Sequence, residues 1–343
     1  MAGIVFSEAS NVANSIYGNC QAPIKMLVES YGEECERKSM LPHLFKMETS
    51  ENFAEMFTEM TGMDGFDPVG ENGAYPEDHM QEGDGKMIVA ETWKDSFSIS
   101  QEMVEDSKVL DMKTKPRNFI RAYNRTREKY GAAMYAGAMC GLSNVPYRNK
   151  MFDITCADGK PLFSTQHPSA TGKGNKQSNC FSNDFSLEAL DLAESAMHLF
   201  EDHNGEIIEV APNTILIPEY ANLKREVFGA VGSDMDPDSA NNAFNFQYGR
   251  WNVIMWPYLN QFLKKHLAEG KRPWIMMDDE FNKEYGGAVW VDRIKLAVRS
   301  VIDENTDANK WKGRSRFKAG FNNWRFAACG GMTGGTDLKT LGL

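Results

Sequence analysis

The feature that most limits how this chain can fold is an acidic, glycine-rich tract at residues 64–85. No lysine or arginine interrupts it before Lys86. Its carboxylates, interleaved with five glycines and two prolines, are Asp64, Asp67, Glu71, Glu77, Asp78, Glu82 and Asp84. Such a composition buries too little apolar surface to offset the entropy of ordering the backbone, so the tract cannot form a core of its own.

Two structures remain open for this tract. It is either a solvated surface loop or an extended arm that packs on another molecule. Residues 86–100, which follow, mix β-forming residues with polar ones, and this pattern predicts a strand that leaves the loop. The second structure would therefore be a long hairpin.

The strongest helical signal comes next. Thr114 and Pro116 form a start signal, and apolar residues then recur at helical spacing to about residue 142. Gly131 and Gly137 lie inside this helix, where each glycine costs about 1 kcal/mol relative to alanine, so we expect close packing there. We expect salt bridges or a solvated face, and not a nucleic-acid stripe, from its basic residues Arg117, Arg121, Arg125, Arg127 and Lys129.

The second half of the chain mixes helices and strands. Ser186 is expected to cap an amphipathic helix whose apolar face continues to Phe200, and Pro218 to start a short helix through Leu223. The strand-like runs are residues 206–210, 214–217, 246–258, 274–277 and 288–302. Because there is no internal repeat and no regular βαβ alternation, the predicted fold class is α+β.

Composition limits the function classes. A chain of 343 residues exceeds the size at which one core usually keeps growing, so two subdomains are expected. The formal net charge of −11 makes sequence-independent nucleic-acid binding a poor candidate, because such binding needs phosphate neutralisation by lysine and arginine. The charge is compatible with a shell that encloses nucleic acid without gripping it.

The cysteines and the N-terminus indicate a compartment. No two of the six cysteines are spaced as CxxC, so a zinc ribbon or redox motif has no support, and scattered thiols fit a reducing environment. The N-terminus lacks the basic start and apolar core of a signal peptide. The longest uncharged run, residues 131–147, is short for a bilayer span. We expect a protein made in the cytosol with no membrane partner.

Catalytic, cofactor and metal motifs were sought and none was found. Ser164 and His167 resemble a nucleophile and its base, but Pro168 and a glycine-rich stretch follow at once, which is loop chemistry and not a nucleophile elbow. No phosphate-binding loop is present. Two calcium-like acidic triplets, at residues 234–238 and 303–307, lack the glycine and the bidentate glutamate that such a loop needs. The sequence therefore predicts no catalytic residue, no cofactor and no metal.

Several blocks, taken in order, resemble the major head subunit of Mu-type tailed phages. These blocks are residues 93–106 (WKDSFSISQEMVED), 163–168 (FSTQHP), 177–179 (QSN), 212–218 and 311–326. Together with the acidic tract they extend from about residue 60 to 329. The resemblance implies the Hong Kong 97-type capsid fold, with an N-terminal arm, an extended E-loop, a P-domain with a spine helix, and an A-domain.

This resemblance also implies a division of the chain and a set of contacts. Residues 1–60 would form the arm, 61–100 the E-loop, 101–185 the P-domain with its spine helix, and 186–309 the A-domain; residues 310–343 would return to the P-domain and end in a tail. An E-loop without its own core would bury side chains on a neighbouring subunit. The expected inter-subunit contacts are Tyr75, Met80, Lys86, Ile88 and Trp93.

The implied function is assembly. The chain would be the major capsid protein of a tailed bacteriophage or prophage, forming hexamers and pentamers of an icosahedral shell around double-stranded DNA. Expected partners are copies of itself, a separate scaffold, a portal and decoration proteins; its location would be the virion and, during assembly, the host cytoplasm. Two alternatives stay open: an encapsulin-like shell for cargo enzymes, and a Ser/His hydrolase.

Overall fold

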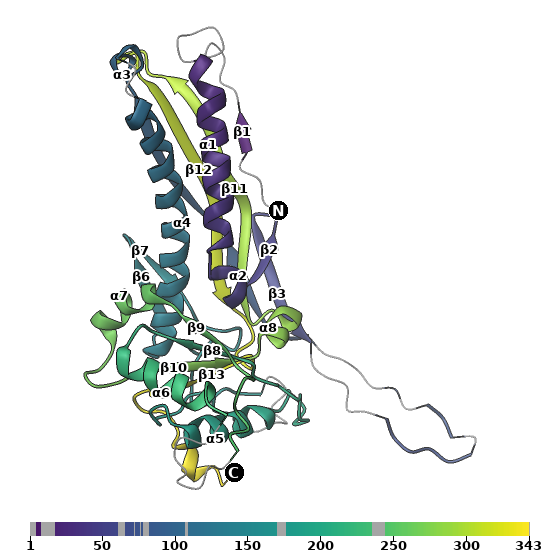
Figure 1. Cartoon of the computed structure of the whole chain (residues 1–343). Coiled ribbons are helices and arrows are strands. Elements are labelled where there is room, and N and C mark those ends of the chain that lie inside the picture. The colour runs from purple at the N-terminus through teal and green to yellow at the C-terminus, as the bar shows by residue number, and fades with distance from the viewer. Residues whose placement is uncertain are drawn as a thin grey trace.

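The computed structural model describes residues 5–7, 18–60, 66–71, 73–75, 77, 82–106, 109–169, 176–234 and 244–342. Figure 1 shows an elongated molecule: long helices lie along long strands at one end, and a second sheet flanked by helices forms the other. The mixture of helices with two separate larger sheets confirms the α+β class.

A five-stranded sheet forms the long end. Its strand order is β1 (Val5–Ser7), β11 (Ala288–Ile302), β12 (Asn309–Phe321) and β5 (Glu91–Ile99), with β2 (Lys46–Thr49) also paired to β11. β11 and β12 are antiparallel, whereas β1 and β2 pair with β11 in parallel. Along β12 the side chains alternate strictly, and one face is buried through Trp311, Phe317 and Phe321. This alternation is typical of a sheet with one packed face and one open face.

Two helices cover the packed face of this sheet. α4 (Val109–Met139) and α1 (Gly18–Arg37) lie along it (Figure 1), and Val28 of α1 joins Ile120 of α4 and Trp311 of β12 in one apolar cluster. The short helices α2 (Leu41–Leu44) and α3 (Gln101–Glu105) lie at the ends of this layer.

The long helix starts earlier than the sequence predicted. Pro116 lies inside α4 and not at its first turn, because a proline removes only one backbone hydrogen bond and does not by itself end a helix of 31 residues. The end of α4 is close to the prediction: Gly141 has φ +68°, and Leu142 N–H donates to the Gly137 carbonyl at 3.0 Å. This is a Schellman-type C-cap.

The glycines of α4 allow the close packing that we expected. A Cβ on Gly137 would lie 2.0 Å from Cγ2 of Val145, and one on Gly131 would lie 2.6 Å from Cδ2 of Leu41. Each glycine therefore permits an approach that any larger residue would block, which offsets its helix penalty.

The second sheet lies at the other end of the molecule. Its order is β13 (Ala327–Gly330), β10 (Trp274–Met277), β8 (Thr214–Ile217) and β9 (Asn252–Met255). Around it lie α5 (Leu187–His198), α6 (Ala221–Val231), α7 (Pro257–His266), α8 (Asp279–Tyr285) and the 3₁₀ turn Leu338–Thr340.

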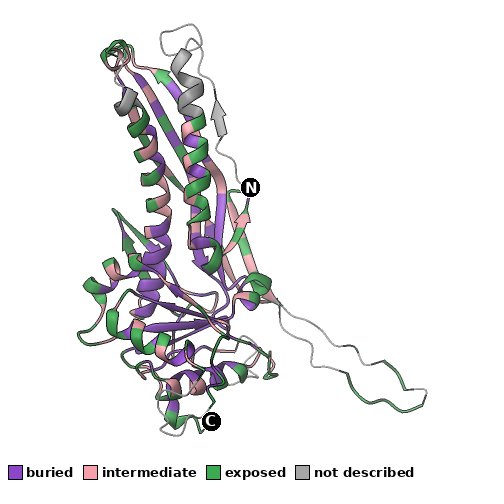
Figure 2. Cartoon of the chain, viewed as in Figure 1, coloured by how far each residue is buried: buried purple, intermediate pink, exposed green. Residues whose placement is uncertain are grey.

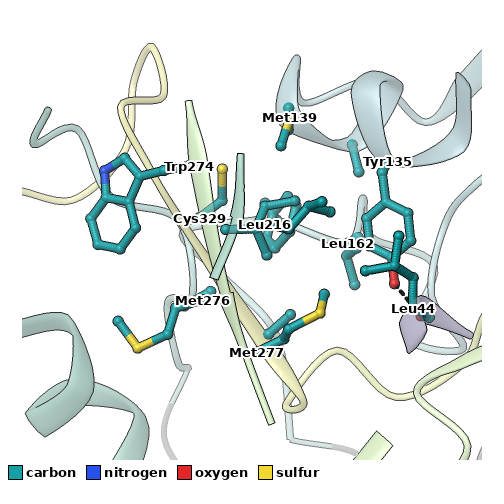
Figure 3. Close-up of a cluster of buried hydrophobic side chains, with 14 of the residues drawn as sticks. Leu44, Tyr135, Met139, Leu162, Leu216, Trp274, Met276, Met277 and Cys329 are labelled. Atoms are coloured by element: carbon teal, nitrogen blue, oxygen red, sulfur yellow. Dashed lines mark hydrogen bonds between the residues drawn. The ribbon is translucent and has the colours of Figure 1, made fainter. Parts of the chain in front are cut away.

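One core joins this sheet to the long helix. Figure 3 shows Leu216, Met277 and Cys329 of the sheet together with Tyr135 and Met139 of α4. The Tyr135 hydroxyl donates to the Leu44 carbonyl at 2.6 Å, which satisfies a polar group inside this core.

Some predicted elements match and others do not. The strands at 214–217, 274–277 and 288–302 have the predicted bounds, and Ser186 caps α5 by accepting from Ala189 N–H at 3.0 Å. Residues 206–210 were wrongly predicted as a strand; only an isolated bridge, Glu201 to Ile207, forms there. The helix predicted at Pro218 begins at Ala221 instead. The run 246–258 divides into β9 and α7, because Pro257 favours a first helical turn.

The predicted strand at 86–100 is two strands in two sheets. β4 (Glu82–Val89) pairs with β3 (Ala54–Met60) in a separate hairpin, whereas β5 joins the long sheet. Beyond this hairpin, the described residues of the acidic tract lie clear of the body and are coloured as exposed in Figure 2. A second small hairpin consists of β6 (Asn144–Tyr147) and β7 (Lys150–Asp153). Within the described ranges, no helix has both the length and the apolarity needed to cross a membrane.

Candidate functional site

Ser164 and His167 do not form a catalytic pair. The His167 ring is buried, with Nδ1 2.6 Å from Oδ2 of Asp158 and Nε2 3.1 Å from Oδ1 of Asn179. It also stacks on Trp324 with ring centroids 4.2 Å apart. The Ser164 hydroxyl instead accepts from the Gln166 N–H. Both imidazole nitrogens are therefore occupied by partners other than Ser164, which removes the base that a hydrolase would need.

This histidine ties the loop at residues 160–179 to the second sheet. The Asn179 amide nitrogen donates to the carbonyls of Leu162 and Ala327, at 2.8 and 2.9 Å, which leaves its oxygen to face His167. Burial alone would raise the pKa of Asp158, but the hydrogen bond and charge of His167 hold that pKa below its ordinary value. The cluster stabilises the loop.

A second buried polar cluster holds the base of the β3–β4 hairpin. Glu59, near the end of β3, accepts from Arg325 Nη1 at 2.9 Å, lies 3.0 Å from His203 Nε2, and also accepts from the Asn323 amide. Arg325 is only 2% exposed, donates to the Glu201 carbonyl at 2.8 Å and lies over the ring of Trp324. Three segments far apart in sequence therefore meet at one carboxylate.

The next residues along β4 attach the hairpin to the body as well. Lys86 donates to Asp153 at 2.5 Å and to the Thr155 hydroxyl at 2.8 Å. Ile88 is 2% exposed and packs with Val289 and Val291 of β11. These contacts lie within one chain, so Lys86 and Ile88 already have partners before any neighbour approaches.

Trp93 belongs to an aromatic cluster of the same chain. It stacks on Phe317 with centroids 5.0 Å apart, and its indole N–H donates to the Phe317 carbonyl at 3.2 Å. Tyr130 and Phe152 complete the cluster. The role of Trp93 in this structure is to join β5 to β12 and α4.

The residues of the predicted set that remain open to contact lie in the acidic tract. Tyr75 is 95% exposed, and its neighbours Phe66 and Val69 are also exposed. Met80 lies outside the described residues. Large apolar side chains held in water are a common mark of a surface used for binding.

Other chemistry is not brought together in the described part of the chain. No group of three metal-ligating side chains forms there, and the cysteines at 35, 140, 156, 180 and 329 are free thiols. Burial raises the pKa of Cys140 and of Cys180 to about 11, so these two thiols stay protonated and unreactive at neutral pH.

Sequence reasoning missed the Glu59 cluster. Glu59 is separated from His203 by 144 residues and from Arg325 by 266. Neither an acidic residue at the end of a strand nor an arginine in an aromatic stretch is unusual, so no local signal indicated that they meet.

The comparisons with known proteins identify the class. The sequence matches the family described as phage capsid protein over residues 84–329, which is most of the chain. The chain therefore belongs to this family of phage capsid proteins. It is a structural protein of a virion shell and not an enzyme. The elements expected of the Hong Kong 97-type fold are present in order: a projecting hairpin, a long helix over a long sheet, and a second sheet flanked by helices.

Solved structures of low sequence identity have related shapes. A chain of Mycobacterium phage Patience is 12% identical, with 98% of this chain and 95% of that chain covered and a TM-score of 0.48. The capsid of cyanophage P-SCSP1u is 10% identical, with 85% and 87% covered and a TM-score of 0.48. A virus-like particle from Pyrococcus furiosus is 9% identical, with 89% and 98% covered and a TM-score of 0.47. No curated protein matches the sequence. The family assignment rests on the sequence match.

Proposed function

We propose that this capsid protein is the major head subunit of a Mu-type tailed phage. Its copies would assemble into hexamers and pentamers of an icosahedral shell around double-stranded DNA. Family membership over residues 84–329 carries this proposal, because it covers the long helix and strands of both larger sheets. The blocks that resemble Mu-type head subunits support the finer assignment.

The elements suggest how the subunit divides its tasks. We assign residues 1–60 to the arm, 61–100 to the E-loop, 101–185 to the P-domain, 186–309 to the A-domain and 310–343 to the return. In this division β11 is shared, since it lies in the A-domain range but pairs with β12 along the long sheet. β13 likewise links the return segment to the A-domain sheet.

The E-loop would join subunits. Tyr75 and its exposed neighbours are available for a contact with the next copy, whereas Lys86, Ile88 and Trp93 hold the base of the arm in place. Met80 is proposed as a contact on sequence grounds alone. Repeated contacts of this kind add avidity around a closed shell even when each is weak. A separate scaffold, a portal and decoration proteins complete the proposed set of partners.

Electron microscopy of the protein purified at high concentration, alone and after co-expression with scaffold, tests the proposal. We expect closed particles with icosahedral symmetry and, from infected or induced cells, double-stranded DNA inside them. A compact monomer under every condition would contradict the proposal. Particles that enclose protein cargo and no nucleic acid would instead establish the encapsulin-like alternative.

A further inference from the structure

The open face of β12 is strongly basic. The side chains that alternate with the buried face are Lys310, Lys312, Arg314, Arg316 and Lys318. On the neighbouring strands, Lys94 of β5 is paired with Arg314, and Arg299 of β11 with Lys312. This concentration of positive charge occurs in a chain whose net charge is −11.

These residues surround a hollow, which we call the basic groove. It has a volume of about 710 Å³ and is lined by Lys94, Arg299, Lys310, Lys312 and Arg314 together with the apolar residues Ile294 and Ala297. Asp95 is its one acidic lining residue. The groove therefore offers both positive charge and an apolar floor.

The positive charges of the basic groove are not neutralised within the described part of the chain. None of its five basic residues belongs to an ion pair there, whereas Lys86, Arg127 and Arg325 each pair with a carboxylate. Like charges directly opposite each other in a sheet destabilise it. A structure that aligns Lys94 with Arg314 and Lys312 with Arg299 is thus suited to receive an anionic partner.

The same chain contains a complementary segment. In the acidic tract, Asp67, Glu71 and Glu77 are exposed and have no ion pair among the described residues. Phe66 and Tyr75, which are almost fully exposed, alternate with these carboxylates. The tract thus offers negative charge and apolar side chains, the two properties that the basic groove can bind.

The tract does not reach the groove of its own chain. Figure 1 shows the described residues beyond β3 and β4 to one side of the molecule, whereas the groove lies along the upper parts of β5, β11 and β12. The occupant must then come from a second copy.

We propose that the acidic tract of one subunit docks in the basic groove of the next. This inference rests on the proposed function, because it names the receiving surface for the E-loop of a shell subunit. Duplex DNA is the competing occupant. Phosphates would match the charge but would leave the apolar floor and the exposed aromatic residues without a partner, so the acidic tract fits better.

Charge reversal tests this proposal. Lys312→Glu combined with Arg314→Glu should lower the yield of particles at least about tenfold at low salt, because like-charge contacts across an interface cost several kcal/mol. The matched control is Arg121→Glu with Arg125→Glu, two exposed residues on the opposite, helical layer, which should assemble as wild type. Thermal unfolding of the reversed subunit should show no loss of stability, since the reversal relieves like-charge repulsion within the sheet.

A compensating variant and a crosslink locate the partner. Asp67→Lys with Glu71→Lys should also block assembly, and combining it with the groove reversal should restore particles. A carbodiimide joins carboxylates to lysines in contact. In wild-type particles, it should link tract peptides to Lys310 or Lys312 of another subunit, and free subunits should show no such link.

Each other outcome overturns the proposal. Groove-reversed particles that form in normal yield with normal DNA content would exclude docking and leave the capsid function intact. Particles that form in normal yield but package less DNA would assign the groove to nucleic acid. Failure of the wild-type protein to form particles would remove the proposed function and the docking together.

Discussion

The base and the tip of the β3–β4 hairpin differ in how their side chains are satisfied. At the base, Glu59 and Lys86 form charged hydrogen bonds within the chain, and Ile88 is buried against β11. At the tip, Phe66 and Tyr75 are almost completely exposed. The base is completed by its own subunit, and the tip is not.

This difference separates two kinds of effect. A substitution at the base removes contacts that exist in the isolated subunit, so it should change the free energy of unfolding. A substitution at the tip removes no contact within the subunit, so its effect should appear only when copies assemble. The predictions below test this separation.

The largest effect is expected at Trp93. Trp93→Ala should lower the free energy of unfolding of the isolated subunit by about 3 kcal/mol, because it leaves a cavity beside Phe317, Tyr130 and Phe152. Denaturant unfolding measures this loss. Trp93→Phe should recover part of it by restoring the stack. An unchanged unfolding midpoint in Trp93→Ala would show that the residue contributes only between subunits.

The buried ion pair at the hairpin base should have a similar effect. Arg325→Met should cost about 3 kcal/mol, because it leaves the Glu59 carboxylate without its cationic partner. Adding Glu59→Gln should restore part of this stability, since the double variant has no unpaired charge. A double-mutant cycle measures the coupling. Strictly additive losses would mean that the two residues act independently.

The pH dependence of the loop cluster should be smaller. Asp158→Asn should cost about 2 kcal/mol at neutral pH by removing a charged, buried hydrogen bond to His167. The pKa of Asp158 is lowered in the folded state, so its contribution is complete above the unfolded pKa and is lost as the pH falls through the folded pKa. Unfolding measured from pH 6 to pH 2 should show a shallower acid loss in the variant. Parallel curves would assign the low pKa to another cause.

The smallest effect on the isolated subunit is expected at Tyr75. Tyr75→Ala should change the free energy of unfolding by less than about 0.5 kcal/mol, because the side chain is 95% exposed. The same variant should lower the yield of particles in a sedimentation assay. A clear loss of subunit stability would show that the tip packs on its own body, and the comparison between base and tip would fail.

Features with a short-range cause could be predicted from the sequence. Ser186 was recognised as a helix cap because a hydroxyl before an apolar face satisfies a free backbone N–H group, and it does so in α5. β8 and β10 were recognised because continuous apolar β-formers mark buried strands. The acidic tract was recognised as unable to form a core from its composition alone.

Features that depend on distant partners could not be predicted. Pro116 indicates a helix start, yet α4 extends past it toward α3. Residues 327–330 have the small side chains of a loop, yet they form β13 because β10 and Cys180 provide hydrogen-bond partners. The single strand predicted at 86–100 became two because Ala90 separates pairing with β3 from pairing with β12.

The amino-acid sequence by itself determined which segments are helical or extended, that the tract at 64–85 cannot pack on itself, and that the chain belongs to a capsid family. Only the tertiary structure decided that Glu59 meets Arg325, and that alternate residues of β12 align with Lys94 and Arg299 to form the basic groove. The physical reason is range. Propensity, capping and composition act within a few residues, whereas charge pairing and cross-strand register depend on segments that folding alone brings together.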